Sequence, residues 1–142
     1  MLKIATIEDL PLVSRMAQSF IESSPYNRHF DMGMVDGVLT QLSTSEDSRK
    51  GIVLLYGEVG MLAGMSSPFI YGPHYMATEL GWWVEPDARK SGAGKELIKA
   101  FEEWARRVGC TLITMISLDD TVSQYYEKNG YVLTERAYMK EL

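Results

Sequence analysis

The spacing of hydrophobic and polar residues predicts helices in the first third of the chain. Residues 2–5 are mostly apolar and suit a short strand. Apolar residues then recur every three or four positions over 10–21, which predicts a helix ending before Pro25. A second helix is expected from Asp31, and the polar, aromatic stretch between the two helices is expected to be a loop.

The middle of the chain has the pattern of strands. Residues 52–56 form a continuous apolar run, Gly57 and the residue after it supply a turn, and 59–65 return as a partner strand. The stretch 66–75 contains two prolines and a glycine, so it is expected to be a long connection or a twisted strand end. A further strand is expected over 77–84.

The C-terminal third alternates helix and strand. Helical spacing runs from Lys95 to Val108, and 111–117 is a β-rich run with apolar residues on both faces, typical of a doubly covered strand. A short helix is expected over 119–128, and a strand from Tyr131 onward. The whole order indicates an α/β fold with a mixed sheet of about six strands and four helices, in a single domain over residues 1–142.

The composition is that of a protein that folds on its own. Hydrophobic residues make up 46% of the 142 residues and charged residues 23%, ordinary globular values. The single cysteine, Cys110, excludes an internal disulfide and is expected to be a small buried residue rather than a nucleophile. No Cys/His cluster has the spacing of zinc ligands, so no metal is expected.

Charge and hydropathy indicate where in the cell the protein is expected and which classes of partner it is not expected to bind. The N-terminus lacks the residue order of a signal peptide and no apolar run reaches membrane-spanning length, so a cytoplasmic protein without membrane contact is expected. A formal net charge of −5 without a basic stripe argues against a nucleic-acid partner.

A glycine-rich turn follows the strand 77–84 and leads directly into a helix. It reads Arg89-x-x-Gly92-x-Gly94, and it fits neither a Walker A loop nor a dinucleotide-binding fingerprint, because Glu96 and Leu97 occupy required positions. Glycines allow close backbone approach, and free N–H groups at a helix N-terminus attract an anion such as a pyrophosphate. The alternative is a turn that merely needs small residues.

Two blocks of the sequence resemble the GNAT superfamily of acyl-CoA-dependent N-acetyltransferases. The block VEPDARKSGAGKELI, at 84–98, is similar to its pyrophosphate-binding motif, Arg/Gln-x-x-Gly-x-Gly/Ala. The block from Asp119 through Val122 and Tyr126 to Tyr131 resembles its C-terminal motif, in which Asn, Ala and Phe are usual at the first, second and last of these positions. The element order matches that fold from end to end.

The resemblance implies acetyl-CoA as cosubstrate, held between two splayed parallel strands. Backbone groups of the first strand would pair with the pantetheine arm, and the turn would hold the pyrophosphate. The cofactor-binding residues implied in this way are Trp82, Trp83, Val84, Arg89, Lys90, Ser91, Gly92, Ala93, Gly94, Lys95 and Asp119.

The resemblance also implies a general acid, since Tyr126 matches the family's usual proton donor. A phenol keeps its proton at neutral pH and can donate it. Its neighbour Tyr125 is expected to belong to the core. Glu79, a lone carboxylate among apolar strand residues, is the candidate general base, and the alternative is a surface-facing residue or a salt-bridge partner.

The expected activity is transfer of an acetyl group from acetyl-CoA to a primary amine by direct attack. The alternative is a GNAT-fold module that binds acyl-CoA as a sensor or scaffold without catalysis. The acceptor, a small molecule or a protein, stays open, as does the choice between monomer and homodimer. Tyr71 and His74 are expected to line the acceptor pocket opposite Tyr26 and His29.

Overall fold

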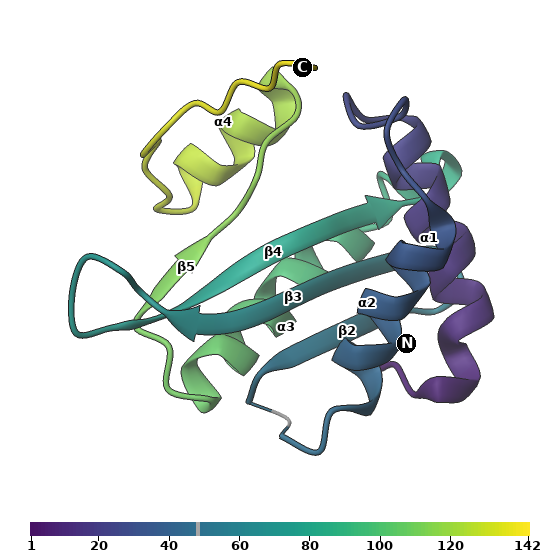
Figure 1. Cartoon of the computed structure of the whole chain (residues 1–142), viewed down its shortest axis with the longest axis horizontal. Coiled ribbons are helices and arrows are strands. Elements are labelled where there is room, and N and C mark those ends of the chain that lie inside the picture. The colour runs from purple at the N-terminus through teal and green to yellow at the C-terminus, as the bar shows by residue number, and fades with distance from the viewer. Residues whose placement is uncertain (48) are drawn as a thin grey trace.

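A computed structural model describes residues 1–47 and 49–142 of the chain, and Figure 1 shows its arrangement. Five strands and four α-helices make up the described structure, with two short 3-10 turns at Ile7–Asp9 and Pro86–Ala88. The elements are β1 (Leu2–Ile4), α1 (Leu10–Glu22), α2 (Met32–Thr44), β2 (Gly51–Tyr56), β3 (Gly60–Pro68), β4 (Tyr75–Val84), α3 (Ala93–Arg107), β5 (Leu112–Thr114) and α4 (Asp120–Lys128).

The strands form one sheet in the order β1-β2-β3-β4-β5. The first four strands pair antiparallel in sequence, and β5 joins β4 parallel through the α3 crossover. The β2–β3 turn contains Gly57 at φ 55°, a conformation that glycine adopts without strain. The sheet is therefore mixed, as the sequence predicted.

Helices cover both faces of this sheet. On one face α1 and α2 bury a cluster that includes Val13, Met16 and Met61. On the other, α3 buries Leu97 and Phe101 against the sheet, because the apolar positions of that helix all fall on one side. Figure 1 shows α1 and α2 in front of the sheet and α3 behind it. No helix in the described part of the chain combines the length and hydropathy needed to span a membrane.

Most of the predicted elements are confirmed. The first helix begins after a capping contact in which the Thr6 N–H donates to Asp9 Oδ2 at 2.8 Å, and α2 begins where the Asp31 side chain accepts from the Met34 N–H. The stretch 66–75 belongs to a hairpin: β3 continues through Pro68 and β4 begins at Tyr75, so the connection between the two strands is limited to residues 69–74.

Three expectations for the C-terminal third are wrong. The strand expected to be doubly covered is an edge strand of the described sheet, and none of its residues is fully buried. The strand expected over 111–117 pairs with β4 only at Leu112–Thr114, because the chain beyond Thr114 diverges from β4. The strand expected from Tyr131 is absent: 131–142 has no regular secondary structure, because within the described residues no other strand lies beside it to form a ladder. The sheet has five strands rather than about six.

Candidate active site

The candidate site lies where β4 and β5 cease to pair. The two strands pair only where Met76–Thr78 faces Leu112–Thr114, and β4 then continues to Val84 without a described strand on that edge. In Figure 1, β5 and the chain that follows it bend away from β4, and α4 stands beside the resulting wedge. The predicted splay between two parallel strands is therefore present in the fold.

A β-bulge on β4 marks the point where the wedge begins. Gly64 of β3 pairs with Glu79, and the preceding residue Ala63 pairs with Gly81, so Leu80 is an extra residue on β4. Bulges bend a strand, increase its local twist and redirect neighbouring side chains. Glu79 thus sits between the paired part of β4 and the part with an open edge.

Glu79 is deeply buried, with 3% of its surface exposed. Burial raises the pKa of Glu79 to about 8. Its Oε2 has no hydrogen-bond partner among the described residues. The alternatives of a surface-facing residue and of a salt-bridge partner do not match this position, since a buried carboxyl without a partner cation is costly unless it holds a proton.

Tyr126 of α4 is the second titratable group of the wedge. It is buried, and its hydroxyl donates to the backbone carbonyl of Ile116 at 3.2 Å. Burial, followed by the nearby carboxylate of Glu79, raises the pKa of Tyr126 above its ordinary value. The phenol therefore keeps its proton at every physiological pH. Tyr125 is half-buried beside the α3-side core, in line with its expected structural role.

Trp82 joins the glycine-rich turn to Tyr126. Its ring centroid lies 6.2 Å from that of Tyr126. On its other side a Cβ added to Gly94 would lie 2.9 Å from Cζ2 of Trp82, closer than real Cβ atoms come. Gly94 is therefore required by close packing against an aromatic ring. The indole N–H of Trp82 is buried and has no acceptor within the described chain.

The glycine-rich turn forms the N-terminal end of α3. Gly92 is the N-cap of α3 at φ 90°, in the left-handed region, and it offers no side chain to cap the first turn. Ser91 Oγ accepts from the Ala93 N–H at 3.3 Å. Lys90 and Lys95 are exposed beside this turn, so two cations flank the N-terminal end of the α3 dipole.

Arg89 is turned toward the end of β4. Its Nε donates to the carbonyl oxygen of Val84 at 3.0 Å, and its guanidinium carbon lies 4.9 Å from the ring centroid of Trp83. One of the backbone groups that the sequence assigned to cofactor pairing, the Val84 carbonyl, is thus already bonded. The structure gives Arg89 a role in fixing the strand end that sequence reasoning did not foresee.

Asp119 is the N-cap of α4. Its carboxylate accepts a hydrogen bond from the Val122 N–H at 2.9 Å, which fixes the start of the helix that carries Tyr126. The Ile116 carbonyl that accepts from Tyr126 lies in the diverging segment, and no side-chain pattern in the sequence could have revealed this backbone partner.

The residues expected to line an acceptor pocket together lie at different ends of the fold. His74 sits on the β3–β4 turn, where its Nδ1 lies 2.8 Å from Thr111 Oγ1, and Tyr71 packs there against Phe69. Nε2 of His29, in the α1–α2 loop, lies 3.4 Å from Oε2 of Glu141 in the C-terminal segment. Figure 1 shows that turn and that loop at opposite ends of the sheet, so the expectation of one shared pocket is wrong.

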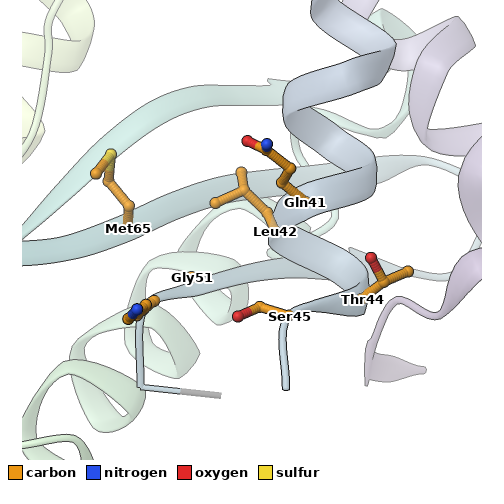
Figure 2. Close-up of a pocket in the computed structure, with 7 residues that line it drawn as sticks. Gln41, Leu42, Thr44, Ser45, Gly51 and Met65 are labelled. Atoms are coloured by element: carbon orange, nitrogen blue, oxygen red, sulfur yellow. The ribbon is translucent and has the colours of Figure 1, made fainter. Parts of the chain in front are cut away.

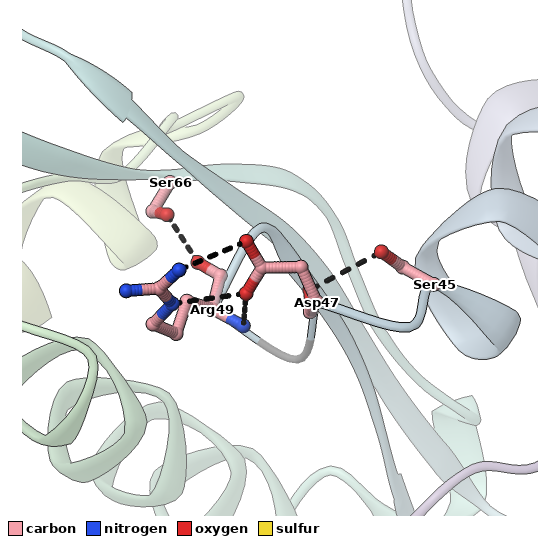
Figure 3. Close-up of polar contacts among 4 residues, drawn as sticks. All are labelled: Ser45, Asp47, Arg49 and Ser66. Carbon is pink, nitrogen blue, oxygen red and sulfur yellow. Dashed lines mark hydrogen bonds and ion pairs between the residues drawn. The ribbon is translucent and has the colours of Figure 1, made fainter.

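A hollow of about 400 Å³ lies outside the wedge, between the end of α2 and the start of β2. Figure 2 shows Leu42 and Met65 among the side chains that line it. Below it, Asp47 accepts from the backbone and the guanidinium of Arg49, and the Arg49 carbonyl accepts from the Ser66 hydroxyl (Figure 3). These polar groups are paired with one another and do not line the hollow, whose lining includes Lys50 but no carboxyl.

Comparison with known proteins connects this geometry to a family. The profile of the acetyltransferase (GNAT) family matches residues 15–131, most of the chain. A stretch of 31 residues is 58% identical to aminoglycoside N(6')-acetyltransferase type 1 of Klebsiella aerogenes, and this stretch spans 22% of the present chain and 20% of that enzyme.

Solved structures share the whole fold. The aminoglycoside antibiotic 6'-N-acetyltransferase of Acinetobacter haemolyticus superposes with a TM-score of 0.71 at 20% identity, covering 100% of this chain and 99% of that one. An acetyltransferase of Trypanosoma brucei gives a TM-score of 0.73 at 21% identity, with the same coverage. At such identities the likeness concerns the fold alone.

Proposed function

Because this chain belongs to the acetyltransferase (GNAT) family, we propose that it transfers an acetyl group from acetyl-CoA to a primary amine by direct attack of the amine. The observation that carries the proposal lies where β4 and β5 diverge: a buried carboxyl whose Oε2 has no partner in the described structure (Glu79) is near enough to a buried phenol (Tyr126) to raise the pKa of that phenol. Two nearby groups with displaced pKa values are typical of acid–base catalysis.

The residues around the wedge fit acetyl-CoA. The edge of β4 beyond Thr78 is open to pair with an extended amide-bearing chain, and the buried indole N–H of Trp82 lacks an acceptor in the described structure. Above Gly92, a Cβ would meet nothing within 4 Å, so there is room for phosphate at the helix N-terminus. Lys90, Ser91, Ala93 and Lys95 complete the cradle.

When bound, acetyl-CoA supplies an acetyl group activated as a thioester. In its deprotonated form Glu79 accepts the proton of the incoming ammonium, so that the amine attacks in its neutral form. Because burial raises the pKa of this carboxyl to about 8, the deprotonated base becomes abundant as pH rises toward and above 8. Tyr126 holds a proton across the wedge and delivers it to the departing sulfur. Trp82, packed between Gly94 and Tyr126, keeps the phosphate cradle and the acid at a fixed separation.

In this proposal Asp119 caps the N-terminus of α4 and so fixes the helix that carries Tyr126. Arg89 fixes the end of β4. The ring of Trp83 lies against the guanidinium of Arg89 and supports it there. These three residues hold the site rather than the reacting atoms. Their loss is expected to change binding and turnover together.

Among acceptors, aminoglycosides have one specific observation in their favour, the 31-residue match to an aminoglycoside N(6')-acetyltransferase. They are amines with several positive charges, and the chain has a formal net charge of −5, which favours approach of a cation. Aminoglycosides therefore head the acceptor panel, together with polyamines, amino acids and lysine peptides.

The test is release of free CoA thiol from acetyl-CoA in the presence of each amine of the panel. We expect turnover with at least one amine and its loss in Tyr126→Phe, with acetyl-CoA still raising the melting temperature of both proteins. A rise in melting temperature without turnover on any amine would favour the acyl-CoA-binding sensor instead. If acetyl-CoA leaves the melting temperature of the wild-type protein unchanged, both alternatives are wrong.

A further inference from the structure

The chain turns back on itself at the C-terminal end of α4 (Figure 1). Asn129 is the C-cap of the helix, and Gly130 follows at φ 89°, in the left-handed region that glycine adopts without strain. The N–H of Tyr131 donates to the carbonyl of Tyr126 at 3.0 Å. The N–H of Gly130 donates to the carbonyl of Glu127 at 3.4 Å. A left-handed glycine with these two bonds is a Schellman motif.

This motif places the ring of Tyr131 against the ring of Tyr126. In a Schellman motif the residue after the glycine frequently contacts the side chain three positions before the C-cap. Here the centroids of the two rings lie 5.2 Å apart, with 47° between the ring planes. Trp82 of β4 is a second aromatic neighbour of Tyr126, at 6.2 Å between centroids. The proposed proton donor therefore has one ring beside it from the sheet and one from the helix cap.

Few other contacts of α4 fix the orientation of this phenol. Tyr126 is buried, Val122 and Tyr125 are partly buried against the α3-side core, and most other side chains of the helix are exposed. The Tyr126 hydroxyl donates to the Ile116 carbonyl, which fixes the far end of the ring. A short helix with few buried contacts moves easily unless a further contact restrains it. The contact with Tyr131 is such a restraint.

Tyr131 is itself held by the body of the fold. Its ring packs, partly buried, against the α3-side core. Burial, followed by the nearby carboxylate of Glu102 on α3, raises the pKa of Tyr131 above its ordinary value. The phenol is therefore neutral at physiological pH and places no charge beside Tyr126. Tyr131 thus connects the end of α4 to α3 through an uncharged ring.

We propose that the C-terminal cap of α4 positions the proton donor: Gly130 returns the chain, and the ring of Tyr131 holds the phenol of Tyr126 in the orientation from which it donates. This inference rests on the proposed function, because it concerns how the general acid of that reaction is held. Gly130 and Tyr131 act through Tyr126 and are positioning residues. A small misplacement of a catalytic group is enough to slow a reaction by orders of magnitude.

The C-terminal end of α3 provides a matched control, because it carries the same motif away from Tyr126. Gly109 has φ 93°, and the N–H of Cys110 donates to the carbonyl of Ala105 at 2.8 Å. A Cβ added at Gly109 or at Gly130 would meet nothing within 4 Å. Alanine at either position therefore imposes the same left-handed backbone strain without a collision. The two substitutions are expected to lower stability to a similar extent.

Steady-state release of CoA by the full-length variants separates positioning from stability. With the amine of the panel that the wild type acetylates best, Gly130→Ala is expected to lower kcat at least about tenfold and to change KM for acetyl-CoA by less than about threefold. Gly109→Ala should unfold at a similar urea concentration and keep the kcat of the wild type. An unchanged kcat in Gly130→Ala, or equal losses in the two variants, would overturn the proposal.

Substitutions of Tyr131 test whether its ring is the part that acts. Tyr131→Leu keeps the backbone bonds and an apolar side chain but removes the ring, and it is expected to lower kcat about tenfold with little change in KM for acetyl-CoA. Tyr131→Phe keeps the ring and should restore most of the lost kcat. If Tyr131→Phe loses as much as Tyr131→Leu, the hydroxyl rather than the ring is required, and the proposal is wrong.

Fluorine NMR tests the positioning without any cosubstrate. Tyr126 is replaced by 3-fluorotyrosine, whose resonance reports whether the ring keeps one environment. We expect one sharp resonance in the wild type and in Gly109→Ala, and a broadened or divided resonance in Gly130→Ala and Tyr131→Leu. One unchanged resonance in all four proteins would overturn the inference even if the wild type acetylates an amine. Failure of the wild type to acetylate any amine would overturn the proposed function, and the inference with it.

Discussion

The two parts of β4 face different surroundings although they belong to one strand. Residues Tyr75–Thr78 lie between β3 and β5, and Ala77 among them is completely buried in the α3-side core. Residues Glu79–Val84 keep β3 on one edge but have no described strand on the other. We call these the paired part and the open part of β4.

The difference shows how one strand serves both stability and chemistry. In the paired part the one buried side chain, that of Ala77, is apolar, as close packing requires. The open part begins at the bulge and contains three buried polar atoms without a partner among the described residues: Oε2 of Glu79 and the indole nitrogens of Trp82 and Trp83. Partnerless polar groups cost stability, and within β4 they occur only in the open part, as the proposed binding of acetyl-CoA there would require.

The largest effect is expected from removing the phenol at the open part. Tyr126→Phe deletes the proton donor and its hydrogen bond to Ile116, and we expect kcat to fall by about 10²- to 10⁴-fold, the usual contribution of a positioned general acid. Steady-state release of CoA measures this. Tyr125→Phe on the same helix is the control and should retain most of the activity. Equal losses in the two variants would contradict the assignment.

A larger side chain at Gly94, where the glycine-rich turn packs against Trp82 of β4, should abolish acetyl-CoA binding. Gly94→Val forces Trp82 to move, because even a Cβ would lie 2.9 Å from its ring, and we expect acetyl-CoA affinity to fall at least about a hundredfold. Isothermal titration checks this. Gly37→Val is the matched control, since a Cβ at Gly37 in α2 meets nothing within 4 Å, and that variant should bind acetyl-CoA normally.

The carboxyl of the open part should set the pH dependence of catalysis. With a pKa of about 8, Glu79 is mostly protonated at pH 7, so kcat/KM of the wild type is expected to rise as pH increases through about 8. Glu79→Gln should lower kcat/KM at pH 8.5 about tenfold or more and remove this rise. Glu58→Gln, on the exposed β2–β3 turn, is the control. An unchanged rise in Glu79→Gln would exclude Glu79 as the base.

The same carboxyl should also make stability depend on pH. Because its pKa is raised in the folded protein, Glu79 destabilises the fold progressively as pH increases from about 5 to about 8. The loss is bounded by roughly 1.4 kcal/mol for each pKa unit of the shift, a few kcal/mol at most. Urea unfolding of wild type and Glu79→Gln at several pH values measures it. Parallel curves for the two proteins would contradict this account of the buried carboxyl.

A substitution in the paired part of β4 should change the stability of the protein and leave the pH dependence of catalysis unchanged. Ala77→Leu overfills a completely buried site, and we expect the free energy of unfolding to fall by about 1–3 kcal/mol. Below the melting temperature, the pH profile of kcat/KM should keep its shape. A changed pH profile would show that the two parts of β4 are coupled more closely than their surroundings indicate.

The sequence predicted the helices and their buried faces well, because the spacing of hydrophobic residues shows which side of an element is buried. The stripe Val13, Met16, Ala17 and the pattern of α3 both identified faces that the structure buries. The glycine-rich turn could also be placed, since it joins a strand to a helix. Which roles its residues play in catalysis stays a prediction.

The remaining features depend on contacts between distant residues. Spacing alone does not show that Gly94 must be small because Trp82 packs on it, or that Arg89 bonds the Val84 carbonyl. A strand-like composition also does not guarantee that a strand forms. Residues 131–142 have that composition, but within the described structure no strand lies beside them to pair with.

Hydrogen exchange with and without acetyl-CoA tests the central claim most directly, because it locates the ligand on the chain. We expect acetyl-CoA to slow amide exchange in the open part of β4, at Trp82 and Trp83, and in the turn Gly92–Lys95, with no change in the β3–β4 turn 69–74. Protection confined to the hollow between α2 and β2, or no protection anywhere, would contradict the assignment of the wedge as the acetyl-CoA site.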